Sequence, residues 1–285
     1  VFDQNLTKIN ATTDALVLSG YSVEIDGNST GLPISYEVDD QSVARILVTQ
    51  DDALGAYWKL NEKLYNGVKD EKGSYSGTLV GLPSVGVSKV WQPGLFGNAL
   101  KLGHSGGRAD LGSVQFDGNF SLSFWVKPES VDANESVLLS KEGISTMNLI
   151  RMEKADGNGC VRVFLYPDGS TEKLALETNS SALQDQVWTQ FCLSYNEGNS
   201  TLSLYQDGEL LDRNTSVVFT GVSLPQRFSS MQLGASGYPG LGLRPFNGML
   251  DDLRLYSMAL SLADAKLIYG GGGGDFDRLG IIGSG

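Results

Sequence analysis

The sequence predicts an all-β fold in which two antiparallel sheets pack face to face. The clearest observation is the segment 120–127, FSLSFWVK, where apolar and small polar residues alternate with the two-residue period of a half-buried strand. The same period recurs in four later segments, 161–166, 188–195, 201–205 and 250–256. Gly, Asn, Asp and Pro separate these runs, as expected for turns between short strands. Strands with one apolar face each are typical of a β-sandwich.

The amino-acid composition indicates a folded protein and argues against a nucleic-acid-binding or membrane-spanning one. The 285 residues include 36 glycines and 41% apolar residues, which is typical of a folded, turn-rich chain. The formal net charge of −12 would repel a polyanion, so we do not expect nucleic acid as a partner. No apolar run is long enough to span a bilayer. Because the chain starts at Val1 without a secretory signal, we interpret it as a piece of a longer secreted or cell-surface protein.

Residues 1–50 form a first region with two predicted strands, 16–25 and 34–48, and a turn cluster between them. The segment 31–46, GLPISYEVDDQSVARI, resembles the immunoglobulin-like repeats of bacterial surface proteins. The resemblance implies a partial immunoglobulin-like β segment, because about 50 residues is short for a complete repeat.

Residues 51–269 carry a second resemblance, in a series of segments that follow one another along the chain. These are AYWKLNE (56–62), KDEKGSYSGTLVG (69–81), PGLFGNALKL (93–102), ADLGS (109–113), FSLSFWVKP (120–128), VWTQFCLSYN (187–196), LSLYQDGEL (202–210) and FNGMLDDLRLYSMALSLADAKLIY (246–269). Together they resemble the laminin-G-like, concanavalin A-like domains of secreted bacterial proteins. The resemblance implies a jelly roll of two antiparallel sheets.

Local patterns agree with this fold. Asp207-Gly208 stands between two strand patterns and predicts a hairpin turn. After the strand 250–256, Ser261 is a suitable N-cap for a short amphipathic helix, with Asp264 three residues further on. We expect Leu262, Ala265, Leu267 and Ile268 to be available for burial on that helix.

Residues 270–285 form a third region, a glycine-rich linker followed by the start of a further β segment. The flanks 1–50 and 275–285 would then be two halves of one immunoglobulin-like domain interrupted by the jelly roll. This hypothesis requires the two flanks to share sheet hydrogen bonds.

The two cysteines have the same parity in their strands. Val161 and Val163 predict an inward face that leaves Cys160 outside, and Phe191 and Leu193 do the same for Cys192. If their strands are neighbours, the two thiols could form a cross-strand disulfide, which would imply an oxidising compartment. The alternative is two unrelated free thiols.

Asp251 and Asp252 are the main candidate functional residues. Asp251 shares the parity of Leu253 and Leu255, so strict alternation predicts that its carboxylate points inward. A buried carboxylate needs either a cation or several backbone N–H groups. The resemblance implies a structural Ca²⁺ here, and oxygen ligands from Asn61, Glu62 and Asp70 could complete the set. The alternative is that Asp251 caps backbone amides without a metal.

Aromatic residues provide a second candidate site. Trp125, Phe164 and Tyr166 have outward parity, and Tyr238 lies in a predicted loop. Exposed aromatic faces stack on sugar rings, so these four could form a carbohydrate platform. The alternative is ordinary packing beneath loops.

The sequence offers no catalytic motif. Laminarinase-like hydrolases of this shape carry a strand motif with three acids, and its nearest approach, Glu37-Val38-Asp39, lacks the third. His104 is the single histidine, in a predicted turn, without the neighbours of a catalytic triad. The glycine run 270–274 lacks the Lys-Ser/Thr of a phosphate-binding loop.

The sequence therefore favours a non-catalytic binding or adhesion module that recognises a glycan or an extracellular protein. Neighbouring β-repeats in the longer chain would be further partners. Two alternatives stay open, a structural spacer and an accessory module of a polysaccharide-degrading enzyme.

Overall fold

The computed structural model describes the greater part of the chain from residue 53 to residue 271. The described residues are 53–63, 66–82, 87–103, 107–115, 118–131, 135–142, 148–155, 157, 159–165, 173–178, 181–217, 230–236 and 244–271. The predicted immunoglobulin-like segment 1–50 and the predicted β segment after the glycine run lie outside them, so the interrupted-domain hypothesis stays a prediction. The described strands and helices belong to one compact unit, Leu54–Gly273.

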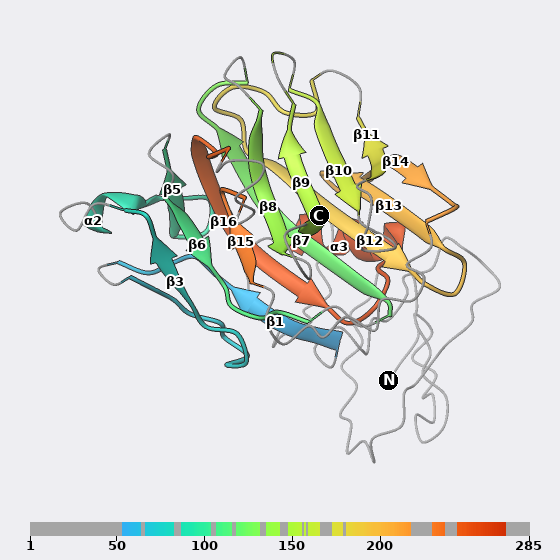
Figure 1. Cartoon of the computed structure of the whole chain (residues 1–285), viewed down its shortest axis with the longest axis horizontal. Coiled ribbons are helices and arrows are strands. Elements are labelled where there is room, and N and C mark those ends of the chain that lie inside the picture. The colour runs from blue at the N-terminus through green and yellow to red at the C-terminus, as the bar shows by residue number, and fades with distance from the viewer. Residues whose placement is uncertain are drawn as a thin grey trace, which may run out of the picture. The chain divides into compact units, whose positions relative to one another are not determined.

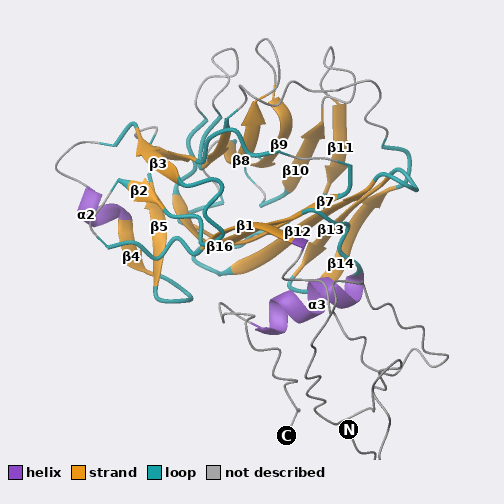
Figure 2. Ribbon diagram, turned by 90° about the horizontal axis from the view of Figure 1, so that it is seen from below, coloured by secondary structure: helices purple, strands orange, loops and turns teal. Residues whose placement is uncertain are grey.

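Two antiparallel sheets form this unit, as the sequence predicts (Figures 1 and 2). Sheet A has the order β14 (Glu209–Asn214), β13 (Thr201–Gln206), β12 (Thr189–Asn196), β7 (Phe120–Pro128), β16 (Gly248–Tyr256), β5 (Asn98–Leu102), β4 (Trp91–Pro93), and β1 (Leu54–Trp58) also pairs with β16. Sheet B has the order β11 (Lys173–Glu177), β10 (Val161–Leu165), β9 (Asn148–Lys154), β8 (Ser136–Glu142), β15 (Met231–Leu233), β6 (Arg108–Asp110), β3 (Gly77–Val80), β2 (Gly67–Val68). Strands distant in sequence are neighbours in both sheets, which is typical of a jelly roll.

The core lies between the two sheets and follows the predicted alternation. In β7 the inward residues are Phe120, Leu122, Phe124 and Val126, all of them buried. The predicted inward residues of the other two strands are buried too: Val161, Val163 and Leu165 in β10, and Phe191, Leu193 and Tyr195 in β12. Each such side chain contributes about 1.5–3 kcal/mol of burial free energy, so this layer dominates the stability of the fold.

Helix α3 (Leu262–Gly271) covers the outer face of sheet A (Figure 2). Its predicted N-cap is confirmed, because the Asp264 N–H donates to Ser261 Oγ at 3.3 Å and the Ser261 N–H donates to Asp264 Oδ2 at 2.7 Å. Ala265 and Ile268 are buried against the sheet. The expected burial of Leu262 and Leu267 is wrong, because they lie on the solvent side and are 37% and 44% exposed.

The structure does not meet the condition set for a disulfide. Cys192 lies in β12 of sheet A, opposite Ser123 and Tyr205, whereas Cys160 directly precedes β10 of sheet B. Both cysteines are buried, and neither forms a disulfide. Cys192 does face outward as predicted, but it is buried in the cluster beneath α3.

A second short helix, α2 (Val87–Val90), precedes β4. Among the described residues, no helix has the length and apolar character needed to cross a membrane.

Candidate ligand-binding site

The outer face of sheet B carries charged and aromatic side chains at its β9–β11 end. Cross-strand pairing places Phe164 of β10 between Arg151 of β9 and Leu174 of β11. It likewise places Arg162 next to Glu177. Since Val163 points into the core, alternation along β10 directs Arg162 and Phe164 outward, where both are partly exposed.

Arg151 and Glu153 lie opposite Phe164 and Arg162 on the same face of the sheet, and they form a buried ion pair. Arg151 Nε is 2.9 Å from Glu153 Oε2, and their side chains are 2% and 1% exposed. Burial raises the pKa of Glu153, and the charge of Arg151 opposes that shift. The Arg151 guanidinium carbon also lies 4.2 Å from the centroid of the Phe164 ring, a cation–π contact against one face of the ring.

More exposed ion pairs surround the aromatic ring. Arg162 contacts Glu177 at 2.7 Å and Glu135 at 3.2 Å. Arg244 contacts Glu135 at 2.8 Å and Glu153 at 3.4 Å. We call the accessible residues of this surface the outer patch: Glu135, Arg162, Phe164, Leu174, Glu177 and Arg244. Because each arginine faces a glutamate, the patch offers many hydrogen-bonding groups with balanced charge.

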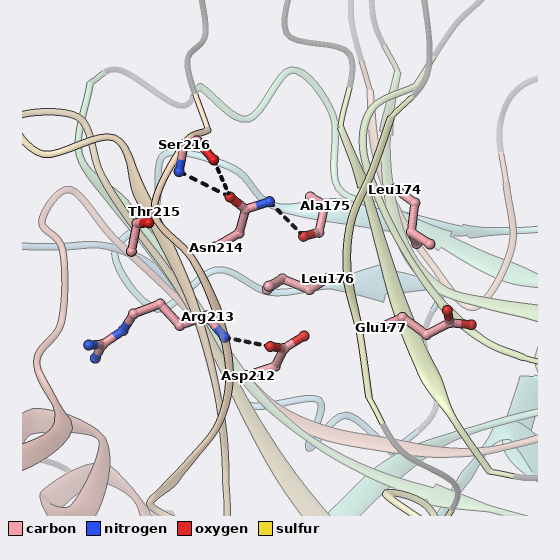
Figure 3. A pocket seen from close by; sticks show the side chains of 9 residues that line it. All are labelled: Leu174, Ala175, Leu176, Glu177, Asp212, Arg213, Asn214, Thr215 and Ser216. Atoms are coloured by element: carbon pink, nitrogen blue, oxygen red, sulfur yellow. Dashed lines mark hydrogen bonds between the residues drawn. The ribbon is translucent and has the colours of Figure 1, made fainter.

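An open cleft of about 370 Å³ lies beside the outer patch, between the edge strands β11 and β14 (Figure 3). Its lining residues are Leu174, Ala175, Leu176, Glu177, Asp212, Arg213, Asn214, Thr215 and Ser216. Asn214 Nδ2 donates to the Ala175 carbonyl at 3.0 Å and so joins the two edges. The Asp212 side chain points toward β11, whereas the Arg213 side chain points away from the cleft (Figure 3). We call this feature the edge cleft.

The predicted aromatic residues do not gather in one place. Phe164 lies on the outer patch of sheet B, as its parity predicts, while Trp125 lies on the outer face of sheet A. Trp125 is covered, because the Tyr269 ring stacks on it with centroids 5.6 Å apart and the Phe96 ring meets it edge-on at 5.9 Å. Tyr166 and Tyr238 lie outside the described residues, as does His104.

Sequence reasoning missed the charged part of the outer patch. Parity alone identifies Arg162 as a neighbour of Phe164 on the outer face. Leu174 and Glu177 join the patch because β11 pairs with β10. The sequence between the two strands does not reveal that they are partners. The edge cleft has no sequence signal, since β11 and β14 are distant in the chain and belong to different sheets.

The inward orientation predicted for Asp251 is wrong. Asp251 lies directly opposite Trp125 on β7, hence on the outer face of sheet A. A β-bulge between Asp251 and Arg254, where Asp252 has φ 54°, shifts the alternation by one residue. Leu253 therefore points into the core although Asp251 does not.

Asp251 is nevertheless buried, beneath the turn that joins β4 to β5. Its Oδ2 atom accepts the N–H groups of Leu95 at 2.9 Å and Phe96 at 3.1 Å. Its Oδ1 atom is buried without a hydrogen-bond partner. Burial raises the pKa of Asp251 to about 7, against the effect of the two N–H groups.

Asp252 has its own partners on the outer face of sheet A. It accepts the Tyr57 hydroxyl at 2.6 Å and forms an ion pair with Arg254 at 3.1 Å. The Arg254 guanidinium also lies over the Tyr57 ring, 4.6 Å from its centroid. Burial raises the pKa of Tyr57, so the hydroxyl remains a donor. Asp252 therefore serves the packing of β1 on β16.

Asp70 organises the loop after β2. Its carboxylate accepts four backbone N–H groups, from Tyr57 at 2.8 Å, Lys72 at 3.0 Å, Ser74 at 2.9 Å and Tyr75 at 2.9 Å. A carboxylate with four such donors is fully satisfied without a cation.

A family model described as the concanavalin A-like lectin/glucanases superfamily matches residues 103–266. The chain belongs to this superfamily. The resemblance to laminin-G-like domains is thereby confirmed, and the matched residues do not include the predicted immunoglobulin-like flanks. No curated protein matches the chain in sequence.

Solved structures share the fold at low sequence identity. The binding domain of botulinum neurotoxin serotype D superimposes with a TM-score of 0.57 and 18% identity, over 78% of this chain and 52% of that one. The present chain thus spans about half the length of the neurotoxin domains it matches. Domain 4 of AbnA, a GH43 extracellular arabinanase from Geobacillus stearothermophilus solved in complex with arabinotriose, gives a TM-score of 0.53 and 20% identity, over 75% of this chain and 96% of that one. At these identities the likeness establishes the jelly-roll fold alone.

Two of the five predicted calcium ligands fit a cation in this member of the superfamily. Asp251 Oδ1 and Glu62 Oε2 are both buried without a hydrogen-bond partner. Both residues adjoin the β4–β5 turn, because the Asn98 side chain donates to the Glu62 carbonyl at 3.0 Å and the Asn98 N–H donates to Asn61 Oδ1 at 2.7 Å. Asp252 and Asp70 do not fit, since other groups satisfy them.

The carboxylates of Asp251 and Glu62 alone cannot supply the six to eight oxygen ligands of a Ca²⁺ ion. Within the described ranges, no three His, Cys, Asp or Glu side chains converge as a metal site. Further oxygens would have to come from the Asn61 amide and from backbone carbonyls of the turn.

The buried Arg151–Glu153 pair beside the outer patch should contribute to the stability of the fold. We expect Glu153→Ala to lower the free energy of unfolding by about 3–5 kcal/mol, because Arg151 would stay buried without its carboxylate. Glu177→Ala is the matched control, since its side chain is 42% exposed, and should change the stability by about 0.5 kcal/mol or less. Urea unfolding of both variants measures the difference. Equal losses would contradict a special role for the buried pair.

Proposed function

We propose that this chain is a non-catalytic carbohydrate-binding module of a larger secreted or cell-surface protein. The outer patch of sheet B is the binding surface. The observation that carries the proposal is the partly exposed Phe164 ring, fixed by Arg151 and surrounded by ion-paired Arg and Glu side chains. An aromatic face stacks on the C–H groups of a sugar ring, and the charged groups around it orient hydroxyls.

The solved neighbours support a glycan as the ligand. Arabinotriose is bound to domain 4 of the arabinanase AbnA, which matches this chain over 96% of its own length. A study of botulinum neurotoxin type C describes interaction with two ganglioside molecules, and the binding domain of neurotoxin DC was solved with rat synaptotagmin II. The fold thus accommodates glycan and protein ligands, and the chemistry of the outer patch favours the glycan.

The charge of the outer patch favours a neutral glycan. Both arginines of the patch are held by glutamates, so neither is free to attract a carboxylated or sulfated sugar. The net charge of −12 acts in the same direction. The same ion pairs support a non-catalytic role, because a glycosidase needs one carboxylic acid that donates a proton and one carboxylate free to attack or to activate water.

An accessory module of a polysaccharide-degrading enzyme is the more specific form of this function. The match to a domain of a GH43 arabinanase favours it. In this role the module would hold a neighbouring catalytic domain close to its polymer and raise the local substrate concentration.

A structural Ca²⁺ ion beneath the β4–β5 turn is a further part of the proposal. Asp251 and Glu62 would supply carboxylate oxygens, and Asn61 would supply an amide oxygen. The ion would neutralise two buried carboxylates and fix the turn that covers the outer face of sheet A.

The binding prediction concerns Phe164. A glycan array and calorimetric titration with arabino-, xylo- and gluco-oligosaccharides should detect neutral ligands, and Phe164→Ala should weaken binding by about 1–3 kcal/mol through loss of stacking. Tyr269→Ala is the matched aromatic control, since Tyr269 lies in α3 and stacks on Trp125 of sheet A, and it should leave the affinity unchanged.

Two outcomes would contradict the proposal. Absence of binding to any glycan would favour a structural spacer. Binding that depends on Tyr269 and not on Phe164 would place the site on the outer side of sheet A instead of sheet B.

The calcium prediction concerns thermal stability. A cation that binds only the native state at 100 times its dissociation constant adds about 2.7 kcal/mol, so Ca²⁺ should raise the melting temperature and EDTA should lower it. Asp251→Asn should abolish the shift, whereas Glu71→Gln on the exposed loop should retain it. A melting temperature that responds to neither reagent would remove the metal from the account.

A further inference from the structure

We propose that the edge cleft between β11 and β14 is a second subsite, which takes one end of a linear neutral oligosaccharide that is bound on the outer patch. This inference rests on the proposed carbohydrate-binding function and extends it to a longer ligand. Three observations support it: the two surfaces are continuous, the cleft is lined by groups that bind sugars, and the Asn214–Ala175 hydrogen bond fixes the cleft.

The outer patch and the edge cleft share two residues. Leu174 and Glu177 line the cleft and also lie beside Phe164 and Arg162 on the outer face of sheet B. Leu174 is 47% exposed, so its side chain provides an apolar surface where the patch meets the cleft. A chain of sugars that stacks on Phe164 and runs across β11 therefore reaches the cleft without a gap.

The cleft is lined by the kinds of group that bind sugars. Asp212 directs its carboxylate toward β11, and Thr215 and Ser216 add hydroxyl groups at one end (Figure 3). Leu176 lies between the two strands and gives the cleft an aliphatic wall (Figure 3). A volume of about 370 Å³ lies within the range of about 300–1,000 Å³ that is usual for small-molecule sites.

The cleft is preformed by side-chain bridges. Asn214 Nδ2 donates to the Ala175 carbonyl at 3.0 Å, and Asn214 Oδ1 accepts from Ser216 N at 3.0 Å and from Ser216 Oγ at 3.1 Å. The first bond joins the edges of the two sheets, and the two bonds from Ser216 hold the Asn214 side chain in place. They also disfavour an extended peptide as the occupant, because a strand added to β11 would compete for the Ala175 carbonyl.

Charge points to a neutral sugar rather than an acidic one. Arg213 directs its guanidinium away from the cleft, toward Ser203 Oγ at 3.2 Å, and Glu177 is held by Arg162. Asp212 is then the charged group that faces the occupant. Its carboxylate accepts hydroxyl hydrogen bonds well and repels uronic acids and sulfated sugars.

The test compares ligand lengths by calorimetric titration with linear arabino-, xylo- and gluco-oligosaccharides of three and eight residues. For the series that binds, the longer ligand should bind about tenfold more tightly, because the cleft adds contacts worth about 1.4 kcal/mol. Asp212→Ala should lower the affinity for the longer ligand by about tenfold and leave the shorter one unchanged. Glu209→Ala is the matched control, since it lies on the same strand and pairs with Lys266 outside the cleft.

The outcomes separate this inference from the proposed function. If neither length binds to the wild-type chain in any series, the proposed function fails, and the subsite fails with it. If both lengths bind with equal affinity, or if Asp212→Ala leaves the longer ligand unaffected, the edge cleft is not a subsite although the binding function stands. If Asp212→Ala and Phe164→Ala both weaken the longer ligand, and only Phe164→Ala weakens the shorter one, the inference is supported.

Discussion

The burial of one face of the central strands between the two sheets is the constraint on which the rest of this structure depends. The alternating apolar residues of β7, β10 and β12 are buried in the core, so a ligand cannot reach these inner faces. Sheet A is largely covered on its outer side, by α3 and by the turn that contacts Trp125 and Asp251. Partly exposed side chains remain at the β10–β11 end of sheet B, in the outer patch and along the edge cleft.

The polar groups of the two sheets accordingly have different roles. On sheet A, Asp252, Arg254 and Tyr57 satisfy one another beneath other side chains and stabilise the packing of β1 on β16. On sheet B, the buried pair Arg151 and Glu153 contacts a partly exposed ring with further ion pairs around it. Rigid groups beside a partly exposed aromatic ring lower the entropic cost of binding, because the ring that would contact the ligand is already ordered.

Much of the fold could be predicted from the sequence because its signals are local. The two-residue period identifies the strands and their core faces, and Ser261 with Asp264 identifies the start of α3. The orientation of Asp251 could not be predicted, because a single bulged residue at Asp252 reverses the parity and nothing in the local sequence marks it. Three further features depend on which strands become neighbours: the charged half of the outer patch, the edge cleft and the separation of Cys160 from Cys192. That choice is made by long-range packing rather than by local sequence.

Hydrogen–deuterium exchange with and without a bound neutral oligosaccharide tests the central claim most directly. We expect slower exchange in β10 and β11, residues 161–165 and 173–177, because the ligand would cover the outer face of sheet B there. Exchange in α3, residues 262–271, should stay unchanged. Protection of α3 and of the turn 94–97, with none in β10 and β11, would contradict the account.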